Sequence, residues 1–251
     1  MTQEQVVNIA TEISYLMLKN GAEIYRVEQC VRFIASAYGY HDADCFAILT
    51  SIVVTVVDGD RVCTRTKRVS DRATDLNKVA ALNDLSRSIC SQCMDYETVM
   101  EKIKEIKAAK PYPFWVSTVT YIVISFFFGL YFKGTWTVAL ICGAVGVVVH
   151  PIQWFGGKIQ TNIFIVNMVT SAVITALLCT VYVTLYPHQL DIMIISLIMN
   201  LVPGVALTHC MRDLISNELI SGLARLAEVF ISGAGTAVGV FLVLSLFGLQ
   251  L

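Results

Sequence analysis

Apolar side chains recur at helical spacing along the first forty residues. Over residues 4–19 they return every three or four positions, which places them on one face of an amphipathic helix. Gly21 is expected to end this helix, because glycine readily adopts the left-handed conformation common just beyond a helix C-terminus. A second helix follows, and it is expected to end at Gly39. Its apolar side consists of Val27, Val31, Ile34, Ala35 and Tyr38.

The pattern then changes to β-prone residues. Residues 46–57 are rich in Val, Ile and Thr, Asp58-Gly59 follows, and residues 61–69 alternate in polarity. Asp-Gly between two β-prone runs predicts a hairpin. Because the first strand is nearly all apolar, we expect it to be central in a sheet and covered on both faces.

Two further helices complete this part of the chain. Ser70 is a candidate N-cap for a helix over residues 71–90, and Asp95 for a helix that runs to about Lys110. With the hairpin, these elements predict that residues 1–110 form an N-terminal soluble α+β domain.

Five long apolar segments occupy residues 111–251. Each has about the 20 residues that a helix needs to cross a hydrocarbon core of about 30 Å. A segment in lipid must satisfy its own backbone hydrogen bonds, so these segments are expected to be helices. The sequence thus predicts a multi-pass α-helical membrane protein with a five-helix transmembrane domain. The predicted spans are 115–132, 136–154, 163–185, 192–210 and 223–249.

Charge divides the chain at the same place. Of 18 Lys and Arg and 19 Asp and Glu, only four of each lie beyond residue 110. Lysines crowd the approach to the first span, so the positive-inside rule puts the N-terminal domain in the cytoplasm and the C-terminus outside. With no signal peptide pattern at Met1, we expect a protein of the cell (inner) membrane, with lipid as a partner. The net charge of −1 does not suggest nucleic acid binding.

Familiar catalytic patterns are missing from the sequence. It contains no G-x-G-x-x-G, Walker A, H-E-x-x-H or G-x-S-x-G motif. The eight cysteines are scattered, and Cys90-x-x-Cys93 lacks the second pair or the histidines of a zinc site. We therefore expect a protein that is not an enzyme and that holds neither a metal nor a cofactor.

The fourth predicted span contains a helix-breaking pair within Asn200-Leu-Val-Pro203-Gly204. Proline removes a backbone donor and clashes with the preceding turn, and the adjacent glycine permits a sharper break. In one interpretation this is a discontinuous helix whose freed backbone groups face a substrate near mid-membrane. In the other it is a simple kink that packing tolerates.

Charged residues follow the break. Thr208, Arg212 and Asp213 come shortly after it, and Arg225 begins the fifth span. They are candidates for a polar cluster at the inner mouth that attracts a carboxylate, although arginines that snorkel to the interface give the same pattern. Glu228 lies about one turn inside the fifth span, where an acid is costly, and is a candidate proton carrier or arginine partner.

Small and polar residues in the spans indicate helix contacts. Gly235 and Gly239 have the spacing that lets two helices approach closely. Asn162, Asn167 and Thr170 in the third span can hydrogen-bond to neighbouring helices without any substrate.

Several of these residues resemble motifs of the threonine/serine exporter family. Residues 20–28 resemble its first motif, which here includes Glu23, Arg26 and Glu28. A second resemblance, to the hairpin and following helix of the family's N-terminal domain, is carried by Asp58-Gly59, Thr64, Thr66 and Asp71-Arg72. A third resemblance, to the family's membrane signature, is carried by residues 201–204, Arg212-Asp213 and residues 221–225. The resemblance extends from about residue 10 to residue 245.

The resemblance implies secondary export of small molecules that bear carboxylates, threonine and serine in some members and succinate in others. Long members have about ten spans, whereas five are predicted here. The chain therefore looks like the YjjP-type half of a split exporter, which forms a hetero-oligomer with a second short multi-span subunit. The residues expected to bind substrate or to line its path are Asn200, Pro203, Gly204, Thr208, Arg212, Asp213, Arg225 and Glu228.

Two alternatives stay open. Glu23 and Arg26 belong to the domain's motif by resemblance, but they could instead only fix the packing of the first two helices. The chain could also be a membrane-anchored regulator or scaffold whose cytoplasmic domain binds a partner. Five spans with a broken helix and buried charge exceed what anchoring needs, so the sequence favours a transporter subunit driven by the proton-motive force.

Overall fold

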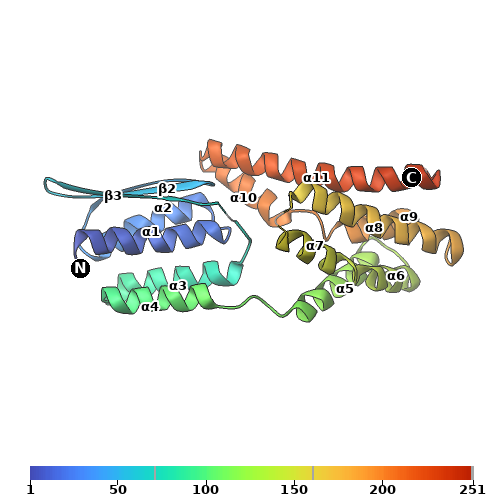
Figure 1. The fold of residues 1–251 in the computed structure, drawn as a ribbon, viewed down its shortest axis with the longest axis horizontal. Coiled ribbons are helices and arrows are strands. Elements are labelled where there is room, and N and C mark those ends of the chain that lie inside the picture. Colours follow the sequence, from blue (N-terminus) through green and yellow to red (C-terminus); the bar gives the residue numbers. More distant parts are fainter. Residues whose placement is uncertain (71, 160, 250–251) are drawn as a thin grey trace. The chain divides into compact units, whose positions relative to one another are not determined.

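The computed structural model describes residues 1–70, 72–159 and 161–249, and its contacts separate two compact units. The first unit joins Met1–Lys110 with the later segment Thr208–Arg225. The second joins Pro111–Leu207 with the described residues from Leu226 onward. Figure 1 colours the elements of both units along the chain.

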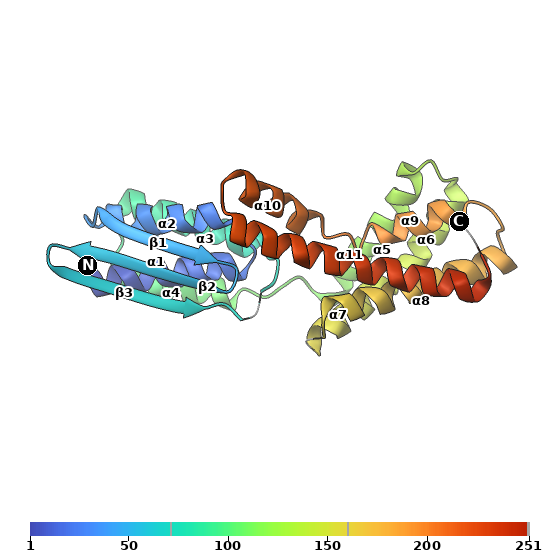
Figure 2. The same cartoon turned by 90° about the horizontal axis from the view of Figure 1, so that it is seen from above.

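The first unit has three layers. Figure 1 shows the sheet, then α1 and α2, then α3 and α4. The sheet is antiparallel in the order β1-β2-β3, and Figure 2 shows its strands side by side with α1 and α2 behind them. The elements are α1 Gln3–Lys19, α2 Ile24–Ala37, β1 Asp42–Ile48, β2 Ser51–Asp58, β3 Arg61–Arg68, α3 Leu76–Gln92 and α4 Tyr96–Ala108.

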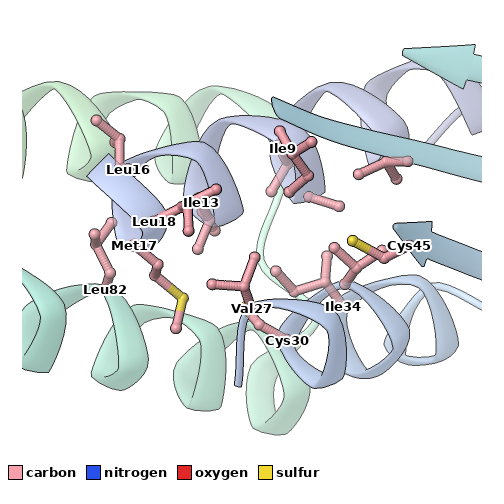
Figure 3. Close-up of a cluster of buried hydrophobic side chains, with 14 of the residues drawn as sticks. Ile9, Ile13, Leu16, Met17, Leu18, Val27, Cys30, Ile34, Cys45 and Leu82 are labelled. Carbon is pink, nitrogen blue, oxygen red and sulfur yellow. The ribbon is translucent and has the colours of Figure 1, made fainter. Parts of the chain in front are cut away.

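The hydrophobic core of this unit surrounds α1. Figure 3 shows Ile9, Ile13 and Met17 of α1 packed with side chains of α2 and α3. Because α1 lies between the sheet and the α3–α4 layer, it is buried on more than the single face that its periodicity predicts. Full burial of such a side chain stabilises the fold by about 1.5–3 kcal/mol.

The sheet differs from its prediction in two respects. The run expected as one strand over residues 46–57 is divided between β1 and β2 by a turn at Leu49-Thr50. That turn contains no glycine or proline, so only the strand pairing reveals it. β2 is central as expected, but the prediction that both of its faces are covered is wrong: Ile52, Val54 and Val56 are buried, and the alternate residues are half-exposed. The hairpin at Asp58-Gly59 is confirmed by the β2–β3 register.

The start of α3 also differs. The helix begins at Leu76, and Asp75 is the N-cap, with its carboxylate accepting from the Lys78 amide at 3.1 Å. The preceding segment is held away from helical geometry, since Ala73 donates to the Lys19 carbonyl and Asp75 to the Asn20 carbonyl. Ser70 is therefore not the cap. Asp95 does cap α4, as predicted.

The second unit is helical. Its elements are α5 Phe114–Tyr131, α6 Trp136–Gly146, α7 Val149–Lys158, α8 Ile163–Thr184, α9 Leu190–Ile198, the start of α10 Gly204–Ile215 and most of α11 Leu219–Phe247. Within the described residues, four helical stretches are long and apolar enough to cross a membrane: 114–131, 136–158 (which joins α6 and α7), 163–184 and 219–247. The predicted fourth span, 192–210, differs because it is divided into α9 and α10, each shorter than a full span.

Glycines hold α8 and α11 together. A Cβ added at Gly235 would collide with the Phe164 carbonyl, and one at Gly239 with Ser171 and the Met168 carbonyl. The close helix approach expected from this glycine pair is confirmed.

Candidate functional site

The break between α9 and α10 is the first candidate feature. α9 ends at Ile198 and α10 begins at Gly204, so residues 199–203 interrupt the helix. Leu201 N–H donates to the Ile198 carbonyl at 2.7 Å in a tight turn, and Pro203 has no N–H to continue the ladder. Helical bonding resumes where Leu207 N–H donates to the Pro203 carbonyl at 3.0 Å. The break is a true discontinuity, because helical hydrogen bonding stops and restarts.

Asn200 lies inside this break and is incompletely bonded. Its Nδ2 donates to Ser125 Oγ at 2.9 Å and to the Leu197 carbonyl at 3.2 Å. Its Oδ1 is buried and, among the described residues, has no hydrogen-bond partner, and the Thr175 hydroxyl is in the same condition. A buried polar atom left unpaired costs about 1–3 kcal/mol. The second unit therefore contains an acceptor that a bound molecule could satisfy.

A second polar group joins three helices of the same unit. Gln153 Nε2 of α7 donates to Asn167 Oδ1 at 3.0 Å and to Thr170 Oγ1 at 3.2 Å. Asn167 Nδ2 of α8 donates to Ser232 Oγ of α11 at 2.7 Å. Asn167 and Thr170 thus bond to neighbouring helices, as the sequence suggested. Gln153, Ser232 and Ser125 were missed, and their only signal is a polar side chain within an apolar run.

The α10–α11 hairpin carries a buried ion pair in the first unit. Arg225 Nε donates to Asp213 Oδ2 at 3.1 Å, and an Arg225 terminal nitrogen donates to the Ala22 carbonyl at 3.2 Å. Both side chains are buried, with Asp213 fully inaccessible. Burial raises the pKa of Asp213, and the nearby Arg225 and the backbone amide of Ile24 offset this only in part. Arg225 is therefore already committed to protein partners.

Glu23 is the other centre of charge in this unit. It occupies the N-cap position of α2 but makes no capping bond. Its carboxylate instead pairs with Arg26 at 2.6 Å and with Arg212 of α10, and His209 Nε2 lies 3.9 Å away. Burial acts to raise the pKa of Glu23, but hydrogen bonding to Tyr25 and the charges of Arg26 and Arg212 outweigh it, so the pKa is lowered. Glu23 is thus ionised and shared between two guanidinium groups.

These contacts bring together the N-terminal motif and the charged residues of α10 and α11, which lie far apart in the sequence. We call Glu23, Arg26, Arg212, Asp213 and Arg225 the charged cluster. His209 was missed by sequence reasoning, although its spacing from Asp213 places both on one face of α10.

Other predicted residues lie outside the cluster. Glu28 accepts from the Ala47 amide at 3.2 Å and pairs with Arg32 at 3.5 Å. Arg72 is an exposed residue between β3 and α3, and Asp71 lies outside the described residues. Thr208 and Glu228 are also exposed. In the described part of the chain, no group of three or more His, Cys, Asp or Glu is placed to hold a metal ion.

Comparison with known proteins gives one family match. The family model ThrE, described as "Putative threonine/serine exporter", matches residues 8–247. A "Probable threonine/serine exporter" of Mycobacterium tuberculosis is 22% identical over 95% of this chain and 45% of its own length. The "Threonine/serine exporter" of Corynebacterium glutamicum is 25% identical over 94% of this chain and 50% of its own.

A relative of similar length carries a different name. The "Probable succinate transporter subunit YjjP" of Escherichia coli is 22% identical over 99% of this chain and 97% of its own length. The chain therefore spans about half the length of the two exporters and nearly all of this subunit. No solved structure matches the chain.

Proposed function

Because the chain belongs to the threonine/serine exporter family, we propose that it is one subunit of a secondary-active exporter of small carboxylate-bearing metabolites. The candidate substrates are threonine, serine and a dicarboxylate such as succinate, which are the molecules in the relatives' names. The full-length match to a transporter subunit supports a second, short membrane subunit as partner. Transport leaves the substrate chemically unchanged, so no enzymatic activity is proposed.

The observation that carries this proposal is the broken helix with its unpaired acceptor. Polar groups within apolar helices are costly, so they are kept where they meet a partner or a substrate. Asn200 Oδ1 lacks a partner among the described residues and lies within four residues of the start of α10. Discontinuous helices with free backbone groups form the substrate sites of many secondary transporters.

The two ends of an amino acid suit this arrangement. The N-terminus of α10 carries partial positive charge and favours a carboxylate. Asn200 Oδ1 is an acceptor, so it can bond to an ammonium or a hydroxyl but not to a second carboxylate. On this basis we place the substrate at Asn200, Pro203 and Gly204, and we favour threonine or serine over a fully ionised dicarboxylate.

The charged cluster is given a supporting role. Arg212 is half-exposed and paired with Glu23, so it is proposed to attract the anion by exchanging that carboxylate for the substrate's. Arg225 is proposed to hold the α10–α11 hairpin through Asp213. Glu228 or Asp213 is the proposed proton carrier. In this arrangement Met1–Lys110 is cytoplasmic and the C-terminus is outside, as the lysines before the first span indicate.

The test is uptake of radiolabelled serine, threonine and succinate into inverted membrane vesicles that contain this chain, with and without its partner subunit. We expect uptake that depends on the proton-motive force and requires both subunits. If the complete complex moves none of the three molecules, the substrate assignment is wrong. If uptake occurs but is unchanged when the gradient is abolished, the proton-motive force does not drive it.

Asn200→Ala tests the site itself. Because a hydrogen bond to a charged group contributes about 1.5–3 kcal/mol, losing the acceptor should weaken apparent substrate affinity at least about tenfold. The matched control is Thr180→Val, which removes an exposed hydroxyl bonded only to the Ala176 carbonyl at 2.8 Å in the described structure. If Asn200→Ala transports substrate normally, the proposal that the helix break lies on the substrate path is wrong.

A further inference from the structure

A cavity of about 450 Å³ in the first unit is lined by four lysines. Each comes from a different element: Lys19 from α1, Lys67 from β3, Lys78 from α3 and Lys107 from α4. Leu16 and Leu82 of the hydrophobic core form an apolar part of its wall. Convergence from four elements does not follow from the amphipathic pattern of any single helix.

Protein carboxylates neutralise these lysines only in part. Glu12, which is 7% exposed, pairs with both Lys67 and Lys107, the second at 2.9 Å. Burial alone would raise the pKa of Glu12, but the two lysines outweigh it and lower the pKa, so this group carries one negative charge. Asp75 lies 3.9 Å from Lys78, and in the described part of the chain Lys19 has no carboxylate partner. Four positive charges therefore face two negative ones.

The position of Lys78 is unfavourable without a further anion. It lies in the first turn of α3, three residues after the N-cap Asp75. The helix dipole disfavours a cation there by about 0.3–1 kcal/mol. Lys19 and Lys107 suit the last turns of their helices, but that does not explain why they face the same cavity as Lys67 and Lys78.

We propose that the lysine cavity, defined by Lys19, Lys67, Lys78 and Lys107, binds a small phosphate-bearing anion. A phosphate brings up to two negative charges, which matches the excess of lysines. The excess positive charge raises the local concentration of anions before any contact forms. The proposal concerns a site on the first unit and does not rest on the transport function.

Phosphate is favoured over carboxylate by the choice of cation. Planar, bidentate recognition of a carboxylate is the strength of arginine, whereas lysine acts as a point charge and is a common phosphate ligand. All four cations of the cavity are lysines. A volume of about 450 Å³ lies in the range typical of small-molecule sites. Leu16 and Leu82 give the cavity an apolar wall for a planar or apolar body such as that of a nucleotide, whereas the face of the Tyr15 ring is taken by Lys67 Nζ, 4.1 Å from its centroid.

The experiment is calorimetric titration of the full chain in non-ionic detergent with pyrophosphate, ATP and succinate. We expect saturable binding of the two phosphates that weakens with added salt. Lys78→Gln should reduce affinity about tenfold or more, since one charge-assisted contact is lost. Because Lys78 opposes the helix dipole, this variant should fold normally. The matched control is Lys104→Gln, which removes one exposed lysine of α4 outside the cavity.

The outcomes separate the sources of the phosphate. Lysine-dependent binding of soluble phosphates identifies a free metabolite. Lysine-dependent binding only of detergent-solubilised phosphatidylglycerol, titrated in the same way, identifies a lipid headgroup, and either result supports phosphate recognition. Equal or tighter binding of succinate overturns the choice of phosphate. No saturable binding in either arm, or equal losses in Lys78→Gln and Lys104→Gln, overturns the site.

Discussion

The two units bury polar groups in different ways. The first unit buries carboxylates beside cations, as with Asp213 and the buried Arg225, or Glu12 and two partly exposed lysines. The network in the second unit uses neutral amides and hydroxyls, exemplified by Asn167 bonded to Ser232. A charge is far more costly than an amide in an apolar environment, so neutral groups suit the unit that contains the long apolar helices.

The means of packing differ in the same way. The first unit encloses large aliphatic side chains around α1, and burial of apolar surface is what stabilises such a core. In lipid there is no such reward for bringing helices together, so close contact must supply the attraction. Gly235 and Gly239 provide that contact between α8 and α11. Removing a charged side chain should therefore reduce the stability of the first unit most. Enlarging a side chain at a helix contact should reduce the stability of the second.

The largest effect is expected from Arg225→Met. This change leaves Asp213 buried without its partner and removes a donor from the Ala22 carbonyl. Breaking one side of a buried ion pair costs about 3–5 kcal/mol. We expect the free energy of unfolding in detergent, measured by denaturant titration, to fall by about 3 kcal/mol.

Its control is the double variant Arg225→Met/Asp213→Leu. Removing both charges leaves no unpaired carboxylate, so most of the lost stability should return. A single variant that is as stable as the wild type would show that the pair does not hold the hairpin in the first unit.

Local features of the sequence predicted much of this comparison. Alternation and the Asp-Gly turn located the β2–β3 hairpin, Asp95 located the start of α4, and the Gly235–Gly239 spacing located the α8–α11 contact. Each depends on residues close together in the chain or on a steric property of one residue type. Pro203 likewise marked the break in the helix.

Long-range pairing is what the sequence could not show. Arg212 and Glu23 are 189 positions apart, and their contact forms only once α10 joins the first unit. The lysine cavity arises in the same way from four separate elements. The turn at Leu49-Thr50 was missed because neither residue type favours turns, and strand pairing overrides that local preference.

A smaller effect is expected from Gly239→Ala in the second unit. The added methyl group would collide with Ser171 and the Met168 carbonyl, so α8 and α11 must separate. Such overpacking costs about 1–3 kcal/mol. The matched change is Gly233→Ala in the same helix, where nothing lies within 4 Å of the new Cβ in the described structure. Thermal unfolding in detergent should show a lower midpoint for Gly239→Ala alone, and equal midpoints would contradict the packing argument.

The smallest effect concerns the acid stability of the first unit. The pKa of Glu12 is lowered below its usual value of 4.5 because Lys67 and Lys107 outweigh the effect of burial. The native state then binds fewer protons than the unfolded state, so the stability that Glu12 contributes is present above pH 4.5 and is lost as pH falls through the lower, native pKa. Glu12→Gln should be less stable than wild type at neutral pH and should lose less on acidification. The unfolding midpoints of the two proteins should therefore converge as pH drops below 4.5.

The control for this prediction is Glu105→Gln, at an exposed position on α4, which should follow the wild-type curve. If the unfolding midpoints of Glu12→Gln and wild type instead change in parallel with pH, Glu12 is not held ionised by Lys67 and Lys107. The lysine cavity would then carry more net positive charge than these ion pairs indicate.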